Sequence, residues 1–332
     1  MVTRAGAERI ERRCRDQRDD RPARAAVLAE LRRSVPFDAY AWVVTDPETN
    51  VGTSPLAEVR SPLPALIRAK YLTSVNRWTT LPARRAVGLA EPAESLVWRE
   101  TQRQHGVTDV ASVRHADRYG CWAFLDLWRV GGRFSTAELD FLSTVAAPMT
   151  AMARGLQARA FDRSTEAPDP GGPVVLVLSP DLEVRAQTAT TDAYLRALIP
   201  PTDERPPIPA AAYNVAAQLL AVEAGVDDHP PMARVHLAPG RWVTLRAERL
   251  AGDIAVTMER SSPAERLAVF RRAMGLSARE GELLAHLAEG HATADVARLM
   301  VLSEHTVQDH IKAIFAKTQS HSRAALLSRI NG

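Results

Sequence analysis

A short segment near the C-terminus places hydrogen-bonding and charged side chains at regular spacing. In VLSEHTVQDHIKAIFAKT, residues 301–318, apolar residues recur at steps of three and four, which predicts an amphipathic helix from Glu304 to about Lys317. Ser303 precedes this helix and is a suitable N-cap residue. The face opposite the apolar residues carries His305, Gln308, Asp309 and Lys312. Such a face either contacts only water or binds a polar partner.

Catalytic motifs are missing from the sequence. It contains no Gly-rich phosphate loop, no G-x-S-x-G elbow, no H-E-x-x-H and no C-x-x-C. Lys70 is the only lysine outside the C-terminal region, which argues against a phosphate-loop ATPase. We therefore expect a protein that is not an enzyme and that uses no cofactor.

Three further short helices are predicted around the amphipathic segment. LSAREGELLAHLAEG begins with Ser277 and Glu280 in the spacing of a capping box. TADVARLM follows, with Thr293 as its expected cap, and a tight connection joins it to the amphipathic segment. Two helices joined this closely form a helix-turn-helix. SHSRAALLSRI predicts a fourth helix, which is capped by Ser320 or Ser322.

The motifs LSARE, AEG, DVA and LSEHTV..HI...F.K, in this order and spacing, resemble the DNA-binding domain of LuxR-type transcriptional regulators of an actinobacterial type. The resemblance covers about the last sixty residues. In that family the third helix enters the major groove of double-stranded DNA, which implies that the polar face contacts DNA. The residues to which we assign DNA binding are Ser303, His305, Thr306, Gln308, Asp309, Lys312, Lys317 and Arg323.

Two positions depart from the family pattern. Gln308 stands where many members carry Lys, and Gln319 stands where a Gly usually ends the recognition helix. The Gln308 amide can donate to and accept from the edge of adenine, while Asp309 can accept from cytosine. Loss of a positive charge at position 308 also weakens non-specific attraction to phosphates.

The charge balance of this region bears on its affinity for DNA. Residues 276–332 contain 6 Lys and Arg and 6 Asp and Glu, so the region has no net charge apart from its five histidines. Because phosphate neutralisation supplies much of the affinity, one copy should bind weakly, and we expect a homodimer on an inverted-repeat operator. In the family the fourth helix forms the dimer contact. This maps to residues 323–330, whose apolar positions are Leu326, Leu327 and Ile330. The alternative is that some of these residues pack against the first helix of their own domain.

Histidine and cysteine are the remaining candidates for metal binding. Cys14 and Cys121, the only two cysteines, lie in a charged segment and in an apolar strand, which argues against a disulfide scaffold or a Cys-based metal site. The five C-terminal histidines fall on different predicted helices, so we expect structural or DNA-facing roles and no metal. They are His286, His291, His305, His310 and His321.

The rest of the 332 residues predicts a multidomain α+β protein. YAWVVT and YGCWAFLDLWRV read as strands, and Ser135 with Glu138 forms a capping box before a long helix, an order similar to the end of a GAF domain. Farther along, two strands, helices and three strands follow in an order similar to a PAS domain. The expected parts are a charged helix or leader (1–34), a GAF-like sensory domain (35–161), a linker (162–173), a PAS-like domain (174–262) and the four-helix output domain (263–332).

Aromatic residues concentrate in the GAF-like region of an otherwise aromatic-poor chain. GAF pockets are commonly lined by such residues, so a small-molecule ligand is one interpretation and ordinary core packing is the other. The pattern of acyl-homoserine lactone sensors is matched only by TDP at residues 45–47, and no ligand is identified. The candidate ligand-binding residues are Trp42, Tyr71, Trp78, Trp122 and Phe124.

The sequence as a whole predicts a transcription regulator whose sensory domains control a helix-turn-helix output. No stretch approaches twenty uninterrupted apolar residues and the N-terminus has no apolar signal region, so we expect a cytoplasmic protein with no membrane partner. RNA polymerase is a further candidate partner. A scaffold or anti-regulator that binds protein rather than DNA is the alternative, suggested by the neutral output domain. A GAF-type enzyme with a vestigial output is a third hypothesis, for which no catalytic motif is present.

Overall fold

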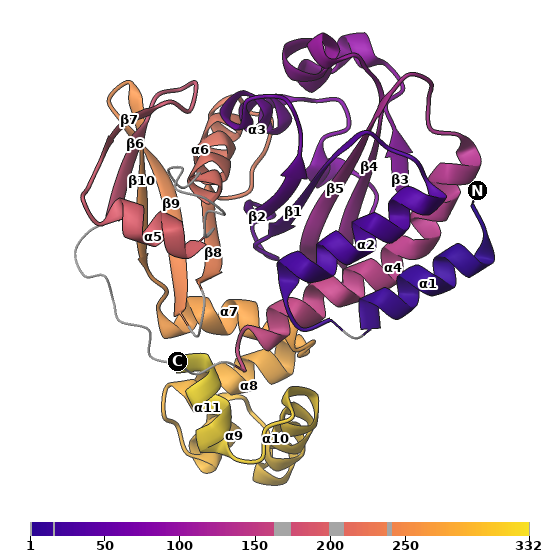
Figure 1. The fold of residues 1–332 in the computed structure, drawn as a ribbon. Coiled ribbons are helices and arrows are strands. Elements are labelled where there is room, and N and C mark those ends of the chain that lie inside the picture. The colour runs from indigo at the N-terminus through magenta and orange to yellow at the C-terminus, as the bar shows by residue number, and fades with distance from the viewer. Residues whose placement is uncertain (1, 16, 163–173, 199–208, 238–240, 332) are drawn as a thin grey trace.

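Two antiparallel sheets precede a helical bundle in this protein (Figure 1). The computed structural model describes residues 2–15, 17–162, 174–198, 209–237 and 241–331. This arrangement confirms the expected α+β fold class with an all-α C-terminal part, while the GAF-like and PAS-like assignments stay predictions. Of the expected linker, only Asp162 lies within the described residues.

The first sheet has five strands in the order β2-β1-β5-β4-β3, all neighbours being antiparallel. The central strand β5 is buried on both faces, as its continuous apolar sequence predicts. The strands are β1 (Ala39–Thr45), β2 (Gly52–Glu58), β3 (Ala86–Gly88), β4 (Val107–Asp117) and β5 (Gly120–Val130).

Helices α1 (Arg4–Arg15), α2 (Asp20–Ser34) and α4 (Thr136–Arg159) pack together on one face of this sheet. The capping box expected at the start of α4 is confirmed. The N-terminal segment, expected to be a charged helix or a leader, forms two helices, but their apolar sides are buried rather than solvated. Ile10 and Leu31 are fully buried in the same core as Leu142 of α4. The Arg and Asp residues that dominate the segment occupy mainly the outer sides of α1 and α2, which concealed this packing from a reading of composition.

Helix α3 (Leu63–Leu72) covers the opposite face of the sheet. Its Leu66 and Ala69 pack with Trp128 of β5. Four short helical turns complete this side: η1 (Trp78–Thr80), η2 (Pro92–Glu94), η3 (Trp98–Gln102) and η4 (Arg103–His105).

The second sheet has the order β7-β6-β10-β9-β8 and is also antiparallel. The expected succession of two strands, helices and three strands is confirmed. Helix α6 lies between the two sheets, where it packs on β9 and β10 of its own sheet and on α3 and β2 of the first (Figure 1). The elements are β6 (Val174–Leu178), β7 (Val184–Gln187), α5 (Thr191–Leu198), α6 (Ala210–Glu223), β8 (Met232–Leu237), β9 (Arg241–Leu250) and β10 (Asp253–Arg260).

The C-terminal bundle comprises α7 (Pro263–Ala273), α8 (Ala278–Ala288), α9 (Thr293–Leu299), α10 (Glu304–Thr318) and α11 (Arg323–Asn331). Ser277 and Glu280 form the predicted capping box of α8, and Ser262 forms another with Glu265 at α7. The expected Thr293 cap is wrong, because α9 already includes Thr293 and Ala292 takes the N-cap position without a side-chain bond. Within the described part of the chain, no helix is both long and apolar enough to cross a membrane.

Candidate functional site

Helix α10 is held in the bundle by its apolar face and by both of its ends. The Ser303 hydroxyl accepts a hydrogen bond from the backbone N–H of Thr306 at 3.1 Å, which confirms the predicted N-cap. Val307 and Ile314 are fully buried against α8, α9 and α11. At the other end Gln319 adopts the left-handed conformation, with φ 54°, that Gly usually provides.

The opposite face of α10 points to solvent and lies at the end of the bundle away from both sheets (Figure 1). His305, Gln308, Asp309 and Lys312 are all exposed. Lys312 Nζ donates to Asp309 Oδ1 at 3.1 Å, and His305 Nε2 lies 3.7 Å from Asp309 Oδ2. The hydrogen bond from Lys312 lowers the pKa of Asp309 below its ordinary value. In the described chain the Gln308 amide makes no intramolecular hydrogen bond, so its donor and acceptor are both available to a partner.

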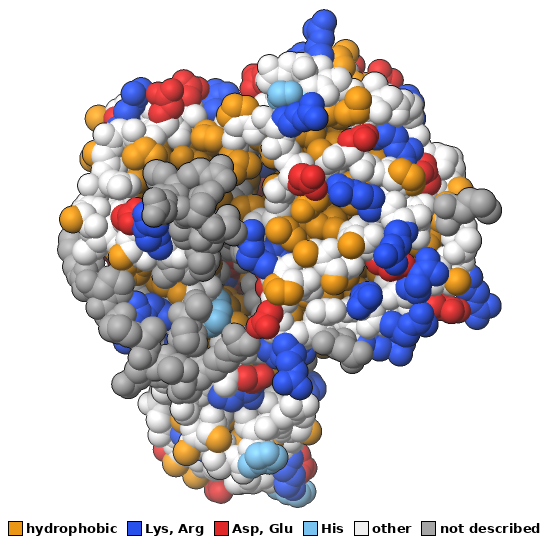
Figure 2. Space-filling model, in the orientation of Figure 1, with side chains coloured by type: hydrophobic (Ala, Val, Ile, Leu, Met, Phe, Trp, Pro, Cys, Tyr) orange, Lys and Arg blue, Asp and Glu red, His pale blue; other side chains and the backbone are white. Residues whose placement is uncertain are grey.

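The cations of the bundle are balanced locally. Figure 2 shows basic, acidic and histidine side chains mixed on the visible face of this part of the molecule. Five of the six Lys and Arg residues in 276–332 lie within 4.0 Å of a carboxylate, and the sixth, Arg323, donates to the backbone carbonyls of Leu287 and His291. The five pairs are Arg279–Glu282, Arg298–Asp295, Lys312–Asp309, Lys317–Glu280 and Arg329–Asp162.

Two residues predicted to bind DNA are therefore engaged inside the domain. Lys317 Nζ donates at 2.6 and 2.8 Å to the carboxylate of Glu280, a buried residue at the start of α8. Burial alone would raise the pKa of Glu280, but hydrogen bonds from Lys317 and Ser277 outweigh it and the pKa is lowered. Lys317 thus ties α10 to α8, and Arg323 ties α11 to the end of α8. Of the other predicted residues, Ser303 and Thr306 form the cap that positions the exposed face.

The apolar residues assigned to a dimer contact on α11 lie in the domain's own core. Leu326 and Ile330 are fully buried, and Leu327 packs partly buried against the same cluster. Helix α7 packs on α11, where Arg266 Nη2 donates to the carbonyl of Arg329 at 3.1 Å. Because α7 packs on α11, these side chains have a partner within one copy of the domain.

The five candidate ligand-binding aromatics are divided between different parts of the first domain. Trp78 and Phe124 stack at 4.9 Å between ring centroids on the α3 side of the sheet. Trp42 stacks on His115 on the α4 side, and Trp122 packs against α4 and α7. The hydroxyl of Tyr71 accepts from the backbone N–H of Gly52 at 2.9 Å. The structure brings together only one pair of the five.

A small cavity adjoins Trp78 and contains polar groups that the sequence prediction missed. Lys70 Nζ lies 2.8 Å from Asp126 Oδ2 and 4.8 Å from the centre of the Trp78 ring, and the Trp78 Nε1–H donates to Asp126 Oδ1. The cavity has a volume of about 30 Å³, which is the share of one water in the liquid rather than the space of a drug-sized ligand. In this conformation Trp78 and its stacking partner Phe124 are therefore part of the packed core. The isolated lysine in an Arg-rich region was the available signal for this site.

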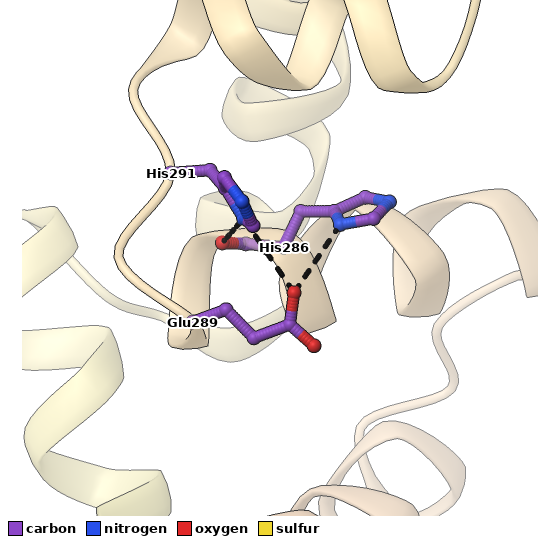
Figure 3. Close-up of side chains that lie close together, drawn as sticks. All are labelled: His286, Glu289 and His291. Carbon is purple, nitrogen blue, oxygen red and sulfur yellow. Dashed lines mark hydrogen bonds and ion pairs between the residues drawn. The ribbon is translucent and has the colours of Figure 1, made fainter.

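The C-terminal histidines do not all stay apart. His286 at the end of α8 and His291 in the following loop approach each other and Glu289, with the two imidazole rings 5.6 Å apart (Figure 3). The expectation that the histidines are separated by their helices is wrong for this pair, because α8 ends between them and the loop turns back. His305 and His310 lie on α10 instead.

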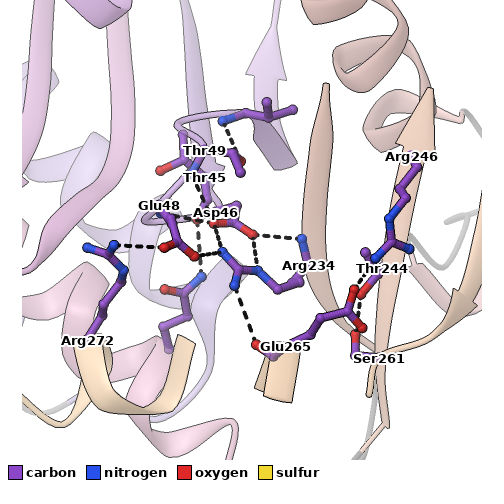
Figure 4. A network of polar contacts seen from close by, with 12 residues as sticks. Thr45, Asp46, Glu48, Thr49, Arg234, Thr244, Arg246, Ser261, Glu265 and Arg272 are labelled. Carbon is purple, nitrogen blue, oxygen red and sulfur yellow. Dashed lines mark hydrogen bonds and ion pairs between the residues drawn. The ribbon is translucent and has the colours of Figure 1, made fainter. Parts of the chain in front are cut away.

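A buried polar network joins both sheets to the C-terminal bundle (Figure 4). Arg234 of β8 donates to both carboxylate oxygens of Asp46, in the turn between β1 and β2, each at 2.7 Å. Glu48 of the same turn accepts from Arg234 at 2.8 Å and from Arg272 of α7 at 3.0 Å. Arg272 also donates to the carbonyl of Tyr119 in the β4–β5 turn. A charged residue in the apolar strand MARVHL was the only sequence signal for this network.

Comparison with known proteins identifies one part of the chain. No curated protein sequence matches. The chromophore-binding domain of the bacteriophytochrome RpBphP3 from R. palustris is 13% identical, with 46% of this chain and 60% of that chain covered and a TM-score of 0.31. Escherichia coli SdiA is 13% identical (98% and 95% covered, TM-score 0.33), and SdiA in complex with octanoyl-rac-glycerol is 14% identical (100% and 99% covered, TM-score 0.32). The model of the "Bacterial regulatory proteins, luxR family" matches residues 274–329, and this segment is therefore a luxR-family domain.

Proposed function

We propose that this protein is a non-enzymatic transcription regulator that binds specific double-stranded DNA through α10. The observation that carries the proposal is the solvent-facing row of His305, Gln308, Asp309 and Lys312 on the third helix of a luxR-family domain. A free amide at Gln308 provides the paired donor and acceptor that recognise adenine in the major groove. Lys312 is the exposed cation of this row and is suited to a phosphate contact.

The N-terminal domains are proposed to control this output through the polar network around Glu48. Arg272 lies on α7, which leads directly into the luxR-family domain, and its guanidinium contacts both Glu48 and the Tyr119 carbonyl of the first domain. The ring of Tyr119 also lies against Gly275, between α7 and α8. A change in the first domain that moves the β1–β2 turn, which carries Glu48, or the β4–β5 turn, which carries Tyr119, would therefore alter the position of the output domain. A small molecule in the first domain, at Trp78 and Phe124, would act in this way if the cavity opens.

Binding is tested first by mapping the DNA that the full-length protein occupies across its genome, and then by fluorescence anisotropy with the operator found. Gln308→Ala should lose about 1 to 3 kcal/mol at one base pair and relax selectivity there. Lys312→Ala should weaken binding to all sequences alike. Ser328→Ala, which changes an exposed residue of α11, is the control. The base-reading role would be refuted if Gln308→Ala bound every operator variant as tightly as the wild type.

We further propose that two copies bind an inverted repeat, because a domain with locally balanced charge has little non-specific attraction to DNA. Sedimentation of the protein with operator DNA should give two chains per operator, and footprints should show two related half-sites. One chain per operator would contradict this proposal. Because Leu326 and Ile330 are buried within one copy, the contact between copies should involve other residues.

The second candidate function, a protein-binding scaffold or anti-regulator, is favoured by the local pairing of the domain's cations. In that case the exposed face of α10 would bind a protein, for which RNA polymerase is one candidate. Full-length protein that occupies no specific genomic site would favour this alternative over the first.

A further inference from the structure

Three side chains at the end of α8 converge on a common point (Figure 3). The Nδ1 atoms of His286 and His291 each lie 3.5 Å from Oε2 of Glu289, and the three side chains each offer a ligand atom within 4.8 Å of the other two. In a tetrahedral zinc site with metal-ligand distances of about 2.0 to 2.2 Å, neighbouring ligand atoms are roughly 3.3 to 3.5 Å apart. Two of the three separations therefore already suit a single metal ion.

The polar atoms of this cluster are poorly satisfied by the protein alone. Nδ1 of His286 is buried and has no hydrogen-bond partner among the described residues, a state that is costly for a polar atom. Glu289 occupies the C-cap position of α8, where the negative end of the helix dipole disfavours a carboxylate. A bound cation would satisfy the imidazole nitrogen and offset the charge of the carboxylate.

We propose that His286, Glu289 and His291 bind one divalent transition-metal ion of the zinc class. Two imidazoles and one carboxylate form a ligand set that suits zinc, with water completing the coordination. Glu289 is 62% exposed, so the fourth position opens to solvent. On binding, His291 Nδ1 gives up its 3.2 Å contact with the carbonyl of His286, which still accepts from the backbone N–H of His291 at 3.1 Å.

The position of the cluster defines what the metal would do. His291 directly precedes Ala292, the N-cap residue of α9, so the ion would join the end of α8 to the start of the first helix of the helix-turn-helix. Arg323 of α11 donates to the carbonyl of His291 at 2.8 Å and supports the same loop. The metal would therefore stabilise the output domain. This proposal does not depend on whether α10 binds DNA.

The other compact group of His and Asp residues lacks these properties. Asp227 and His229 are bonded to each other at 2.5 Å, and Asp227 Oδ2 also accepts from Arg77 and Thr79. The Nε2 atom of His229 is 2.6 Å from the Asn50 amide. The ligand atoms of Asp227 and His229 are therefore already used in holding the two sheets together, and Asp228 is fully exposed.

The test is a zinc titration of the metal-free full-length protein against a chromophoric chelator at neutral pH. We expect one zinc ion per chain, and a loss of affinity of at least about tenfold in His291→Ala and in Glu289→Gln. His305→Ala, which removes an exposed histidine beside Asp309 in the same domain, is the matched control and should bind zinc as the wild type does.

A second readout separates metal binding from folding. Circular dichroism with EDTA should show the same fold for the wild type and Glu289→Gln, since Glu289 is largely exposed. Zinc should then raise the Tm of the wild type and of His305→Ala, but not that of Glu289→Gln or His291→Ala. Equal zinc affinity in wild type and His291→Ala, or an equal rise in Tm in all variants, would overturn the proposal.

Discussion

The buried ion pair between Arg234 and Asp46 provides the sharpest test of how the two sheets are held together. The side chain of Arg234 is 2% exposed and that of Asp46 is 0% exposed. Burial alone would lower the pKa of Arg234, but its hydrogen bonds with Asp46 and Glu48 outweigh burial and raise it. We expect Arg234→Met to leave a buried carboxylate without its cation and to destabilise the protein strongly.

The size of the effect follows from what Asp46 retains. Removal of one partner from a buried pair typically costs about 3 to 5 kcal/mol. Asp46 would keep the backbone N–H groups of Glu48, Thr49 and residue 234, at 2.9, 3.3 and 2.8 Å. Three remaining donors favour the lower end of that range, so we expect a loss of about 3 kcal/mol in the free energy of unfolding.

The assay is urea denaturation of the full-length protein, with hydrogen exchange to locate the loss. Arg249→Met is the matched control, because Arg249 also makes two 2.7 Å bonds to one carboxylate, that of Glu223, but both side chains are about one-third exposed. An exposed pair of this kind contributes about 1 kcal/mol or less. In Arg234→Met, hydrogen exchange should accelerate in β1 and β8. The double variant Arg234→Met with Asp46→Asn should lose less free energy of unfolding than the sum of the two single losses.

The reasoning would be refuted if Arg234→Met cost no more than Arg249→Met. Additive losses in the double variant would also contradict it, because they would mean that the two charges do not interact.

Three other predictions test separate features. Asp309→Ala should free Lys312 from its 3.1 Å bond and raise affinity for all DNA. In anisotropy measurements, the dependence of log K on log salt should steepen by about one, and an unchanged slope would contradict this. Gln319→Gly should stabilise the output domain by about 1 kcal/mol in thermal unfolding, since Gln319 has φ 54°, and Gln319→Ala, which keeps a Cβ, should not. Burial lowers the pKa of His115 to about 4 from 6.5, so His115 favours folding above pH 6.5 and this contribution is lost as the pH falls towards 4. His115→Gln should therefore lose less stability than the wild type between pH 6.5 and 4, and parallel curves would contradict the assignment.

Local sequence determined much of the C-terminal bundle. The N-cap of α10 at Ser303 and the capping box at Ser277 could be predicted, as could the capping box at Ser135 in the first domain, because each depends on residues within one or two helical turns. The exposed face of α10 followed from its periodicity for the same reason.

Tertiary structure decided which side chains meet. Arg234 and Asp46 are 188 positions apart and nothing in their local sequence pairs them. Leu326 was assigned to a dimer contact by the family resemblance, but it lies in a core that it shares with residues of α7. Ile10 was concealed among Arg residues in the sequence, although α1 packs on the first sheet. The meeting of His286 with His291 depended on where α8 ends and how the loop turns. Contacts of this kind arise from the packing of whole elements, so periodicity and capping along the chain cannot specify them.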